Sequence, residues 1–204
     1  MATSILLRDI RASFPSLFTL NEYEGRKSYR CSYIIQKGSE NYKLIMAAIK
    51  AEAKAAWPDE WEDKLAEFKP QPMKYCVKDG DKSKYESTKG AIILTASRGE
   101  ENGKPAVVGA RKDPATGKFI PIAPDEGKVY SGVRCNTTVE IWAQVKNAKS
   151  KHEGMRCALI NWQFFKHADS FGGAAPATDA GLPDLGYDDD DLGSEESGEE
   201  NDFA

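Results

Sequence analysis

Positive charge is absent from the end of this 204-residue chain, because no Lys or Arg follows Lys166. Residues 169–204 carry 12 Asp and Glu, whereas residues 1–168 hold all 28 Lys and Arg against 20 acids, a net charge of +8. A basic body is typical of proteins that bind polyanions, and an acidic terminal segment commonly serves interactions. The charge pattern therefore favours nucleic-acid binding by a body whose own tail resembles a polyanion.

Residue patterns typical of enzymes and metal sites are also scarce. The two histidines, His152 and His167, flank the last predicted strand in polar surroundings, and no P-loop glycine motif occurs. Two-metal chemistry would need several carboxylates on the core strands, where Glu140 is nearly alone. We therefore predict that the protein is not an enzyme and uses no cofactor or metal.

The cysteines indicate a reducing environment. Cys31, Cys76, Cys135 and Cys157 lie far apart, without a CxxC motif or a histidine at zinc spacing. Each lies in an apolar or strand-like run, which favours reduced thiols in the core of an intracellular protein. No apolar run reaches membrane length, and charged residues come too early for a signal peptide, so we expect no membrane association.

Strand patterns dominate residues 1–168. Pro15 is expected to end the first strand, and Asn102-Gly103 is expected to join two strands as a hairpin turn. Residues 113–117 predict a tight turn with glycine in the left-handed position. Alternation of apolar and polar residues predicts strands over residues 3–14, 26–37, 90–98, 105–112, 129–146 and 154–167.

A helical pattern interrupts the strands. Asn41 is expected to cap a helix whose apolar stripe ends before Pro58, and residues 59–68 predict a second short helix. We therefore predict a mainly β fold, an OB-fold-like small barrel with a helical insertion, over residues 1–168. The pattern alone does not separate it from other β-barrels. Residues 169–204 are rich in Gly, Ala, Pro, Asp, Glu and Ser, which predicts a disordered acidic tail.

Aromatic and basic residues alternate in the body, as single-strand binding by base stacking and phosphate neutralisation requires. The residues at 74–89 predict a mobile lysine-rich loop along a backbone groove, with a solvated charged loop as the alternative. Tyr75, Tyr85 and Tyr130 are equally compatible with stacking and with packing. We assign to packing Trp57, Trp61, Trp142, Trp162, Phe14 and Phe164. The predicted DNA contacts are Arg30, Lys74, Tyr75, Lys78, Lys82, Lys84, Tyr85, Arg98, Arg111, Lys112, Tyr130 and Arg134.

Two stretches carry a family resemblance. VYSGVRCNTTVEIWAQVKNAKSKHEGMRCALINWQFFKHADSFGG (residues 129–173) and the upstream block GAIILTASRGEENGKPAVVGARKDP resemble single-stranded DNA-binding proteins of tailed bacteriophages, which have an OB fold. The acidic tail that closes on Phe203, here followed by Ala204, fits the same family. In the tail, the residues we expect to bind partners are Asp188, Asp189, Asp190, Asp191, Asp202 and Phe203.

The resemblance implies a sequence-nonspecific single-stranded DNA-binding protein of phage replication, recombination or repair, acting in the cytoplasm of the infected bacterium. Its tail would compete with DNA and recruit replication or recombination proteins, and a homodimer is left open. The alternatives are a protein-binding adaptor with an acidic tail, and an RNA- or duplex-binding module. A titration with single-stranded DNA would distinguish these alternatives.

Overall fold

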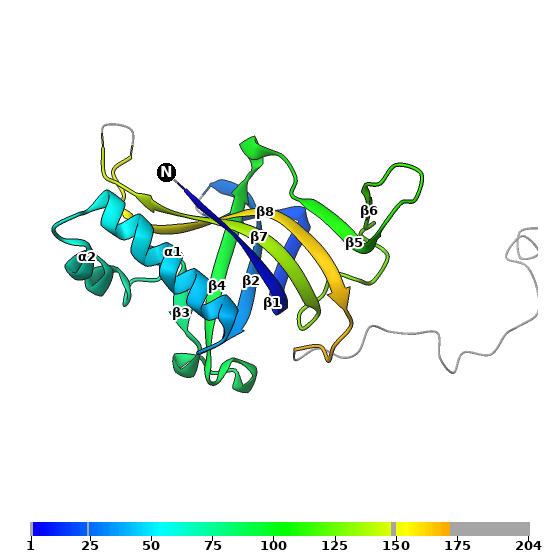
Figure 1. The fold of residues 1–204 in the computed structure, drawn as a ribbon, viewed down its shortest axis with the longest axis horizontal. Coiled ribbons are helices and arrows are strands. Elements are labelled where there is room, and N and C mark those ends of the chain that lie inside the picture. The colour runs from blue at the N-terminus through cyan, green and yellow to red at the C-terminus, as the bar shows by residue number, and fades with distance from the viewer. Residues whose placement is uncertain (1, 24, 148–149, 172–204) are drawn as a thin grey trace, which may run out of the picture. The chain divides into compact units, whose positions relative to one another are not determined.

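The computed structural model of the chain describes residues 2–23, 25–147 and 150–171. Within these ranges, eight strands and two α-helices are joined by loops that hold three short 3-10 helices (Figure 1). The strands are β1 (Thr3–Tyr23), β2 (Arg26–Gln36), β3 (Val77–Asp79), β4 (Ala91–Gly99), β5 (Ala106–Lys112), β6 (Phe119–Pro121), β7 (Arg134–Gln144) and β8 (Gly154–Lys166). The helices are α1 (Glu40–Ala56), α2 (Trp61–Phe68), η1 (Gly80–Lys82), η2 (Glu86–Thr88) and η3 (Glu100–Asn102).

Five of the strands form a closed barrel. β1 pairs antiparallel with both β2 and β7, β2 pairs with β4, and β7 pairs with β8. A parallel contact between Ser97 of β4 and Ala158 of β8 closes the ring. β3 lies beside β4, and β5 followed by β6 continues the sheet from β8. This connectivity confirms the predicted OB-fold-like barrel.

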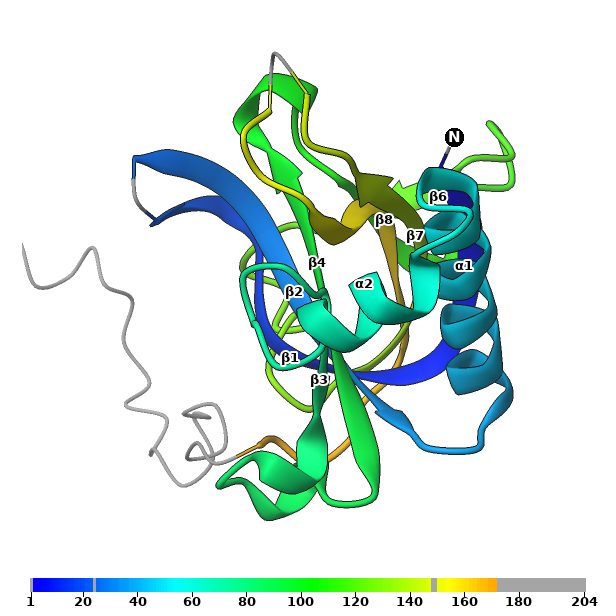
Figure 2. The ribbon, with the colours of Figure 1, turned by 90° about the vertical axis from the view of Figure 1, so that its left-hand side faces the viewer.

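The core lies inside the barrel and under α1. Along β7, alternate residues from Cys135 to Ile141 are buried, as a strand with one face inward requires. Ile45, Ile49 and Ala53 of α1 join the same buried cluster. Figure 2 shows α1 beside β1 and β7, so the helical insertion covers one side of the barrel.

α1 begins differently from the sequence prediction. Ser39, not Asn41, caps the helix, because its hydroxyl oxygen accepts a hydrogen bond from the Tyr42 amide at 3.2 Å. The Asn41 side chain instead accepts a hydrogen bond from the Arg8 amide and donates one to the Arg8 carbonyl, at 3.1 and 2.8 Å. The prediction of the cap was wrong, and Asn41 docks α1 onto β1.

β1 continues beyond Pro15, where the sequence analysis ended it. The register between β1 and β2 shifts between Ser13 and Ser16, so Pro15 falls in an irregularity. Proline is tolerated there, because the residue owes no ladder hydrogen bond. Phe14 next to it has a φ of 48°.

The predicted Asn102-Gly103 hairpin was also wrong. β5 does not return along β4 but pairs parallel with β8, with Val107 opposite Trp162. Both edges of β4 are already used, since β2 lies along one side and β3 and β8 share the other. Asn102 instead ends η3, and Gly103 follows it as the C-cap.

The four cysteines are free, and Cys31, Cys135 and Cys157 are buried. Burial raises the pKa of the Cys31 and Cys76 thiols to about 12, so neither is ionised near neutral pH. In the described ranges, no helix is long and apolar enough to cross a membrane. The predicted disordered tail spans residues 169–204, of which residues 172–204 lie outside the described ranges. Residues 169–171 are described, and the Phe171 amide donates a hydrogen bond to the Ser131 carbonyl.

Candidate nucleic-acid interface

Four aromatic rings stand out on the described surface. Phe14, Tyr85, Phe119 and Phe165 are between 41% and 69% exposed, and we refer to them as the exposed ring set. Large apolar side chains are normally buried, because burial of one contributes about 1.5–3 kcal/mol. Rings that remain in water therefore point to a surface with a binding role.

Three members of the exposed ring set carry a lysine above the ring. Such a pair offers a flat apolar face for a base and a positive charge for the neighbouring phosphate. The distances from ammonium nitrogen to ring centroid are 5.3 Å for Lys84 and Tyr85, 5.2 Å for Lys112 and Phe119, and 5.1 Å for Lys166 and Phe165.

Phe14 is the most exposed member, and its assignment to the core was wrong. The irregularity in β1 turns its side chain outward, and its amide donates a hydrogen bond to the Ser131 hydroxyl at 2.7 Å. Its ring lies 6.3 Å from the ring of Tyr85, at an interplanar angle of 55°. The two rings form one aromatic patch from segments far apart in the sequence.

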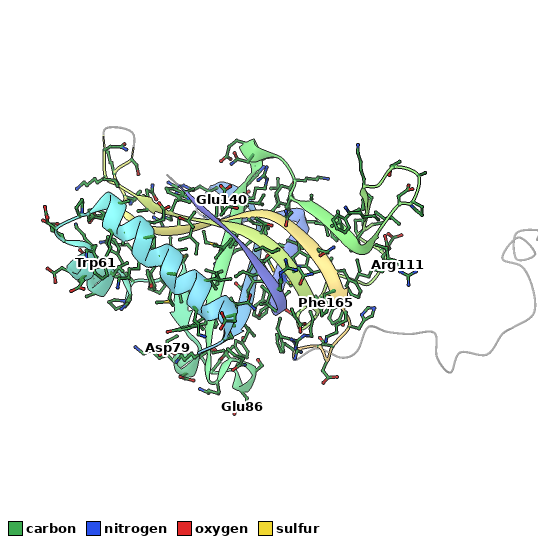
Figure 3. All side chains as sticks on the ribbon, viewed as in Figure 1. Trp61, Asp79, Glu86, Arg111, Glu140 and Phe165 are labelled. Atoms are coloured by element: carbon green, nitrogen blue, oxygen red, sulfur yellow. The ribbon has the colours of Figure 1, made fainter. Side chains whose placement is uncertain are left out.

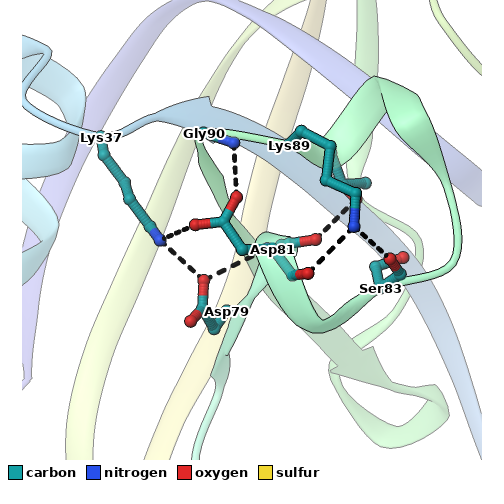
Figure 4. A network of polar contacts seen from close by, with 8 residues as sticks. Lys37, Asp79, Asp81, Ser83, Lys89 and Gly90 are labelled. Carbon is teal, nitrogen blue, oxygen red and sulfur yellow. Dashed lines mark hydrogen bonds and ion pairs between the residues drawn. The ribbon is translucent and has the colours of Figure 1, made fainter.

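The loop that carries Tyr85 is held by a charged network (Figure 4). The Lys37 ammonium lies 2.7 Å from a carboxylate oxygen of Asp79 and 2.6 Å from one of Asp81. Asp81 also accepts a hydrogen bond from the Gly90 amide, while Lys89 donates to the Asp81 carbonyl at 2.9 Å. The hydrogen bonds from Lys37 hold the pKa of both carboxyls below their ordinary value. Residues 77–90, which we call the lysine loop, are therefore tied by contacts of their own.

The network separates the lysines of this loop into two groups. Lys89 is used internally, whereas Lys78, Lys82 and Lys84 are exposed and form no ion pair with any described residue. The last three are therefore available to a polyanion. Two of them, Lys82 and Lys84, lie within three residues of Tyr85.

The barrel end beside Phe14 is built from the start of β7 and the end of β8. The Tyr130 hydroxyl accepts a hydrogen bond from the Ala168 amide and donates one to the Ala168 carbonyl, at 3.0 and 2.9 Å. The His167 ring stacks on Tyr130 with centroids 5.9 Å apart. Arg11 lies over the Phe171 ring at 4.3 Å. Tyr130 is thus half-buried and engaged, and it offers less free surface than the exposed ring set.

The arm formed by β5 and β6 supplies the remaining cations. Arg111 and Lys112 end β5 in exposed positions, and Figure 3 shows Arg111 at the same end of the barrel as Phe165. The predicted turn that follows is present: Gly117 has a φ of 65°, and its amide donates to the Asp113 carbonyl at 2.8 Å. Arg111 forms no ion pair with a described residue, so its charge is free.

Three predicted contacts are used inside the protein. Arg98 donates to the carbonyls of Asn102 and Gly103 at 2.6 and 2.9 Å. Arg134 is paired with Asp9, and its hydrogen bond keeps the pKa of that carboxyl low. Lys74 lies 2.7 Å from Glu67. All three cations are half-exposed, and Arg134 and Lys74 are partly neutralised by their carboxylate partners.

Tyr75 does not belong to the surface. Its side chain is only 5% exposed, and burial raises the pKa of its hydroxyl. A base cannot stack on it without opening the core, so we leave it out of the interface. Arg30, in contrast, is exposed on β2.

The predicted DNA contacts do not include Phe14, Phe119, Phe165 and Lys166, which the structure leaves exposed. A lysine next to the ring in the sequence was a usable signal for two of them, in Lys118-Phe119 and Phe165-Lys166. Nothing local marks Phe14, because its exposure follows from the irregularity in β1.

Comparison with known proteins gives one family. A family model described as the ssDNA-binding protein of Enterobacter phage Enc34 matches residues 3–192. Protein p50 of Acyrthosiphon pisum secondary endosymbiont phage 1 is 29% identical over 188 residues, which cover 89% of this chain and 93% of that protein.

Two solved structures share the fold. The bacteriophage Enc34 single-stranded DNA-binding protein in complex with ssDNA aligns with a TM-score of 0.62 and 19% identity, over 83% of this chain and 89% of that one. The single-stranded DNA-binding protein gp2.5 of bacteriophage T7 aligns with a TM-score of 0.52 and 12% identity, over 92% and 98%. At these identities the structural matches establish the architecture.

Proposed function

Because this chain belongs to the family of the Enterobacter phage Enc34 ssDNA-binding protein, we propose that it binds single-stranded DNA without sequence preference. The observation that carries the proposal is the exposed ring set with its lysines. Every base has a π face, so stacking on such rings tolerates any sequence.

The charge of the body supports the same proposal. A net charge of +8 over residues 1–168 attracts a polyanion, and the free cations of the lysine loop and of Arg111 and Lys112 neutralise phosphates. The interface therefore combines a salt-sensitive contribution from phosphates with a less salt-sensitive one from stacking.

We further propose that residues 169–204 act as a competing polyanion and as a hook for partner proteins. The tail carries 12 acids and ends near Phe203. A disordered chain of 36 residues, as the composition of this segment predicts, would span roughly 30–36 Å. DNA would displace the tail, and the freed Asp188–Asp191 and Asp202-Phe203 would bind replication or recombination proteins.

Coating of exposed strands during phage replication, recombination or repair in the host cytoplasm is the corresponding role. It requires no catalysis and no cofactor. A homodimer remains a prediction that the length dependence of binding and a sedimentation measurement would test.

The decisive experiment is an anisotropy titration of labelled dT oligomers at several salt concentrations. We expect log K to fall linearly with log salt, by roughly 0.7 for each phosphate contacted. Negligible affinity at low salt would instead favour the adaptor alternative. Binding of RNA or of duplex DNA as tightly as dT, or more tightly, would favour the RNA- or duplex-binding alternative.

The tail proposal needs its own comparison. A chain ending at Phe171 is the appropriate truncation, because Phe171 still donates its amide to the Ser131 carbonyl at 3.0 Å and lies under Arg11. The truncated chain should bind dT more tightly than the full chain, most at low salt, because salt screens the competition. Equal affinities at low salt would remove the competing role and leave the partner role to be tested by pull-down.

A further inference from the structure

A cavity of about 270 Å³ opens between β5, β6 and the end of β8. It exists because β5 and β8 stop pairing at Val108 and Gln163, although both strands continue. β6 pairs antiparallel with β5 at Val108 and at Lys112, and the register shifts between these two pairs. The strands thus leave a slot at the edge of the sheet.

The lining of this slot suits a flat ligand. Ile120 and Pro121 line the slot, and so does Gly109, which adds no side chain to fill it. Phe164 is half-buried against the core, and its ring is held edge-to-face by His167 at 4.9 Å. A fixed aromatic ring in a slot also lined by aliphatic side chains suits the flat faces of a nucleobase.

The charges at the slot distinguish among occupants. The Lys128 ammonium lies 2.6 Å from a Glu126 carboxylate oxygen, so these two lining residues neutralise each other. Arg111 lines the slot without an ion pair to any described residue. Lys112, the next residue, lies over the Phe119 ring of the exposed ring set. One free guanidinium beside an apolar slot is complementary to a base with its phosphate. An apolar side chain of a partner protein would fill the slot but would leave the guanidinium without a counter-charge.

We propose that this slot is a subsite for one nucleobase of the bound single strand, with the adjoining phosphate on Arg111. The inference rests on the proposed function and deepens it. It extends the interface from the barrel onto the β5–β6 arm, so a strand stacked on Phe119 continues into the slot.

The first test places a carboxylate at the mouth of the slot. Ile120 is 49% exposed, so Ile120→Asp should fold normally, and Leu44→Asp on α1, at 45% exposure, is a control with the same change of charge and similar polarity. In full-length protein, Ile120→Asp should weaken dT binding by about 5- to 150-fold, the range expected for one lost stacked base. Leu44→Asp should weaken it less than about twofold, because screening limits the effect of a distant charge.

The second test is direct. Oligomers that contain 5-iodo-deoxyuridine are bound to the wild-type chain and irradiated, and the cross-linked peptide is identified by mass spectrometry. Adducts on Phe164, or on the peptide that contains Ile120, are the expected result. This measurement decides the matter if Ile120→Asp loses stability in a thermal melt.

The outcomes separate the subsite from the function. If wild-type protein binds dT, both Asp variants bind equally well and the adducts lie elsewhere, the subsite is refuted and the proposed function stands. If wild-type protein does not bind dT at low salt, the proposed function fails and the subsite fails with it.

Discussion

The lysine loop and the β5–β6 arm both present a lysine above an exposed ring, but different forces hold them. The loop is fixed by Lys37, Asp79 and Asp81 through ion pairs in contact with water. The arm is fixed by strand pairing and by the buried side chains of Val107 and Ile122. The same surface chemistry can therefore rest on a polar or on an apolar support.

The largest expected effect is a loss of stability at Tyr75, which precedes the lysine loop. Tyr75 lies in the core, so Tyr75→Ala should lower the free energy of unfolding by about 3–5 kcal/mol, as large aromatic truncations in cores do. The affinity of the folded fraction for dT should stay unchanged. Urea unfolding and anisotropy check the two parts, with Tyr75→Phe as the control that keeps the ring. A loss of affinity without a loss of stability would return Tyr75 to the interface.

The rings at the two supports come next. Tyr85→Ala in the loop and Phe119→Ala in the arm should each weaken dT binding by about 1–3 kcal/mol, because each removes one stacking face. Both rings are exposed, so the melting temperatures should barely move. Leu44→Ala serves as the matched exposed control. If only one of the two variants loses affinity, the strand follows that support alone.

The cations give a smaller effect with a distinctive signature. Arg111→Ala in the arm and Lys84→Ala in the loop should each lower the slope of log K against log salt by about 0.7, the contribution of one phosphate on a single strand. Lys43→Ala on α1 should leave the slope unchanged, since Lys43 is paired with Glu40 away from the exposed ring set. Unchanged slopes in both test variants would place the phosphates elsewhere.

The smallest effect is a dependence of the lysine loop on pH. The lowered pKa values of Asp79 and Asp81 mean that their stabilisation is complete above the ordinary value of 3.8 and is lost as the pH falls through the lower folded values. Between about pH 7 and pH 5 the loop should not change. Below about pH 4, NMR signals of Tyr85 should shift before those of Phe119, and Asp81→Asn should reproduce part of that shift at neutral pH. Simultaneous shifts of both rings would show a common support.

Several elements followed from local pattern alone. The alternation of residues in β2, β7 and β8 located these strands to within a few residues, because each has one face inside the barrel. The stripe of Ile45, Ile49 and Ala53 identified the buried face of α1 for the same reason. Seven of the predicted contacts are exposed in the structure, and their role in binding remains a prediction: Arg30, Lys78, Lys82, Lys84, Tyr85, Arg111 and Lys112.

Other outcomes depend on partners that only the fold brings together. Arg98 donates to the carbonyls of Asn102 and Gly103, and its contact with DNA stays a prediction. Asn102-Gly103 has good hairpin chemistry, yet β5 pairs with β8 because β4 has no free edge. Neither outcome is visible in a window of a few residues.

The sequence by itself determined the charge division, the mainly β character and the faces that strands and helix turn inward, because these depend on composition and on periods of two and 3.6 residues. Only the tertiary structure decided which rings remain in water. Phe14 is exposed by an irregularity in β1, and the slot beside Phe164 exists because β5 and β8 part after Val108. Exposure and cavities depend on which distant segment covers a residue, and strand pairing over long separations is settled by the competition of all edges at once.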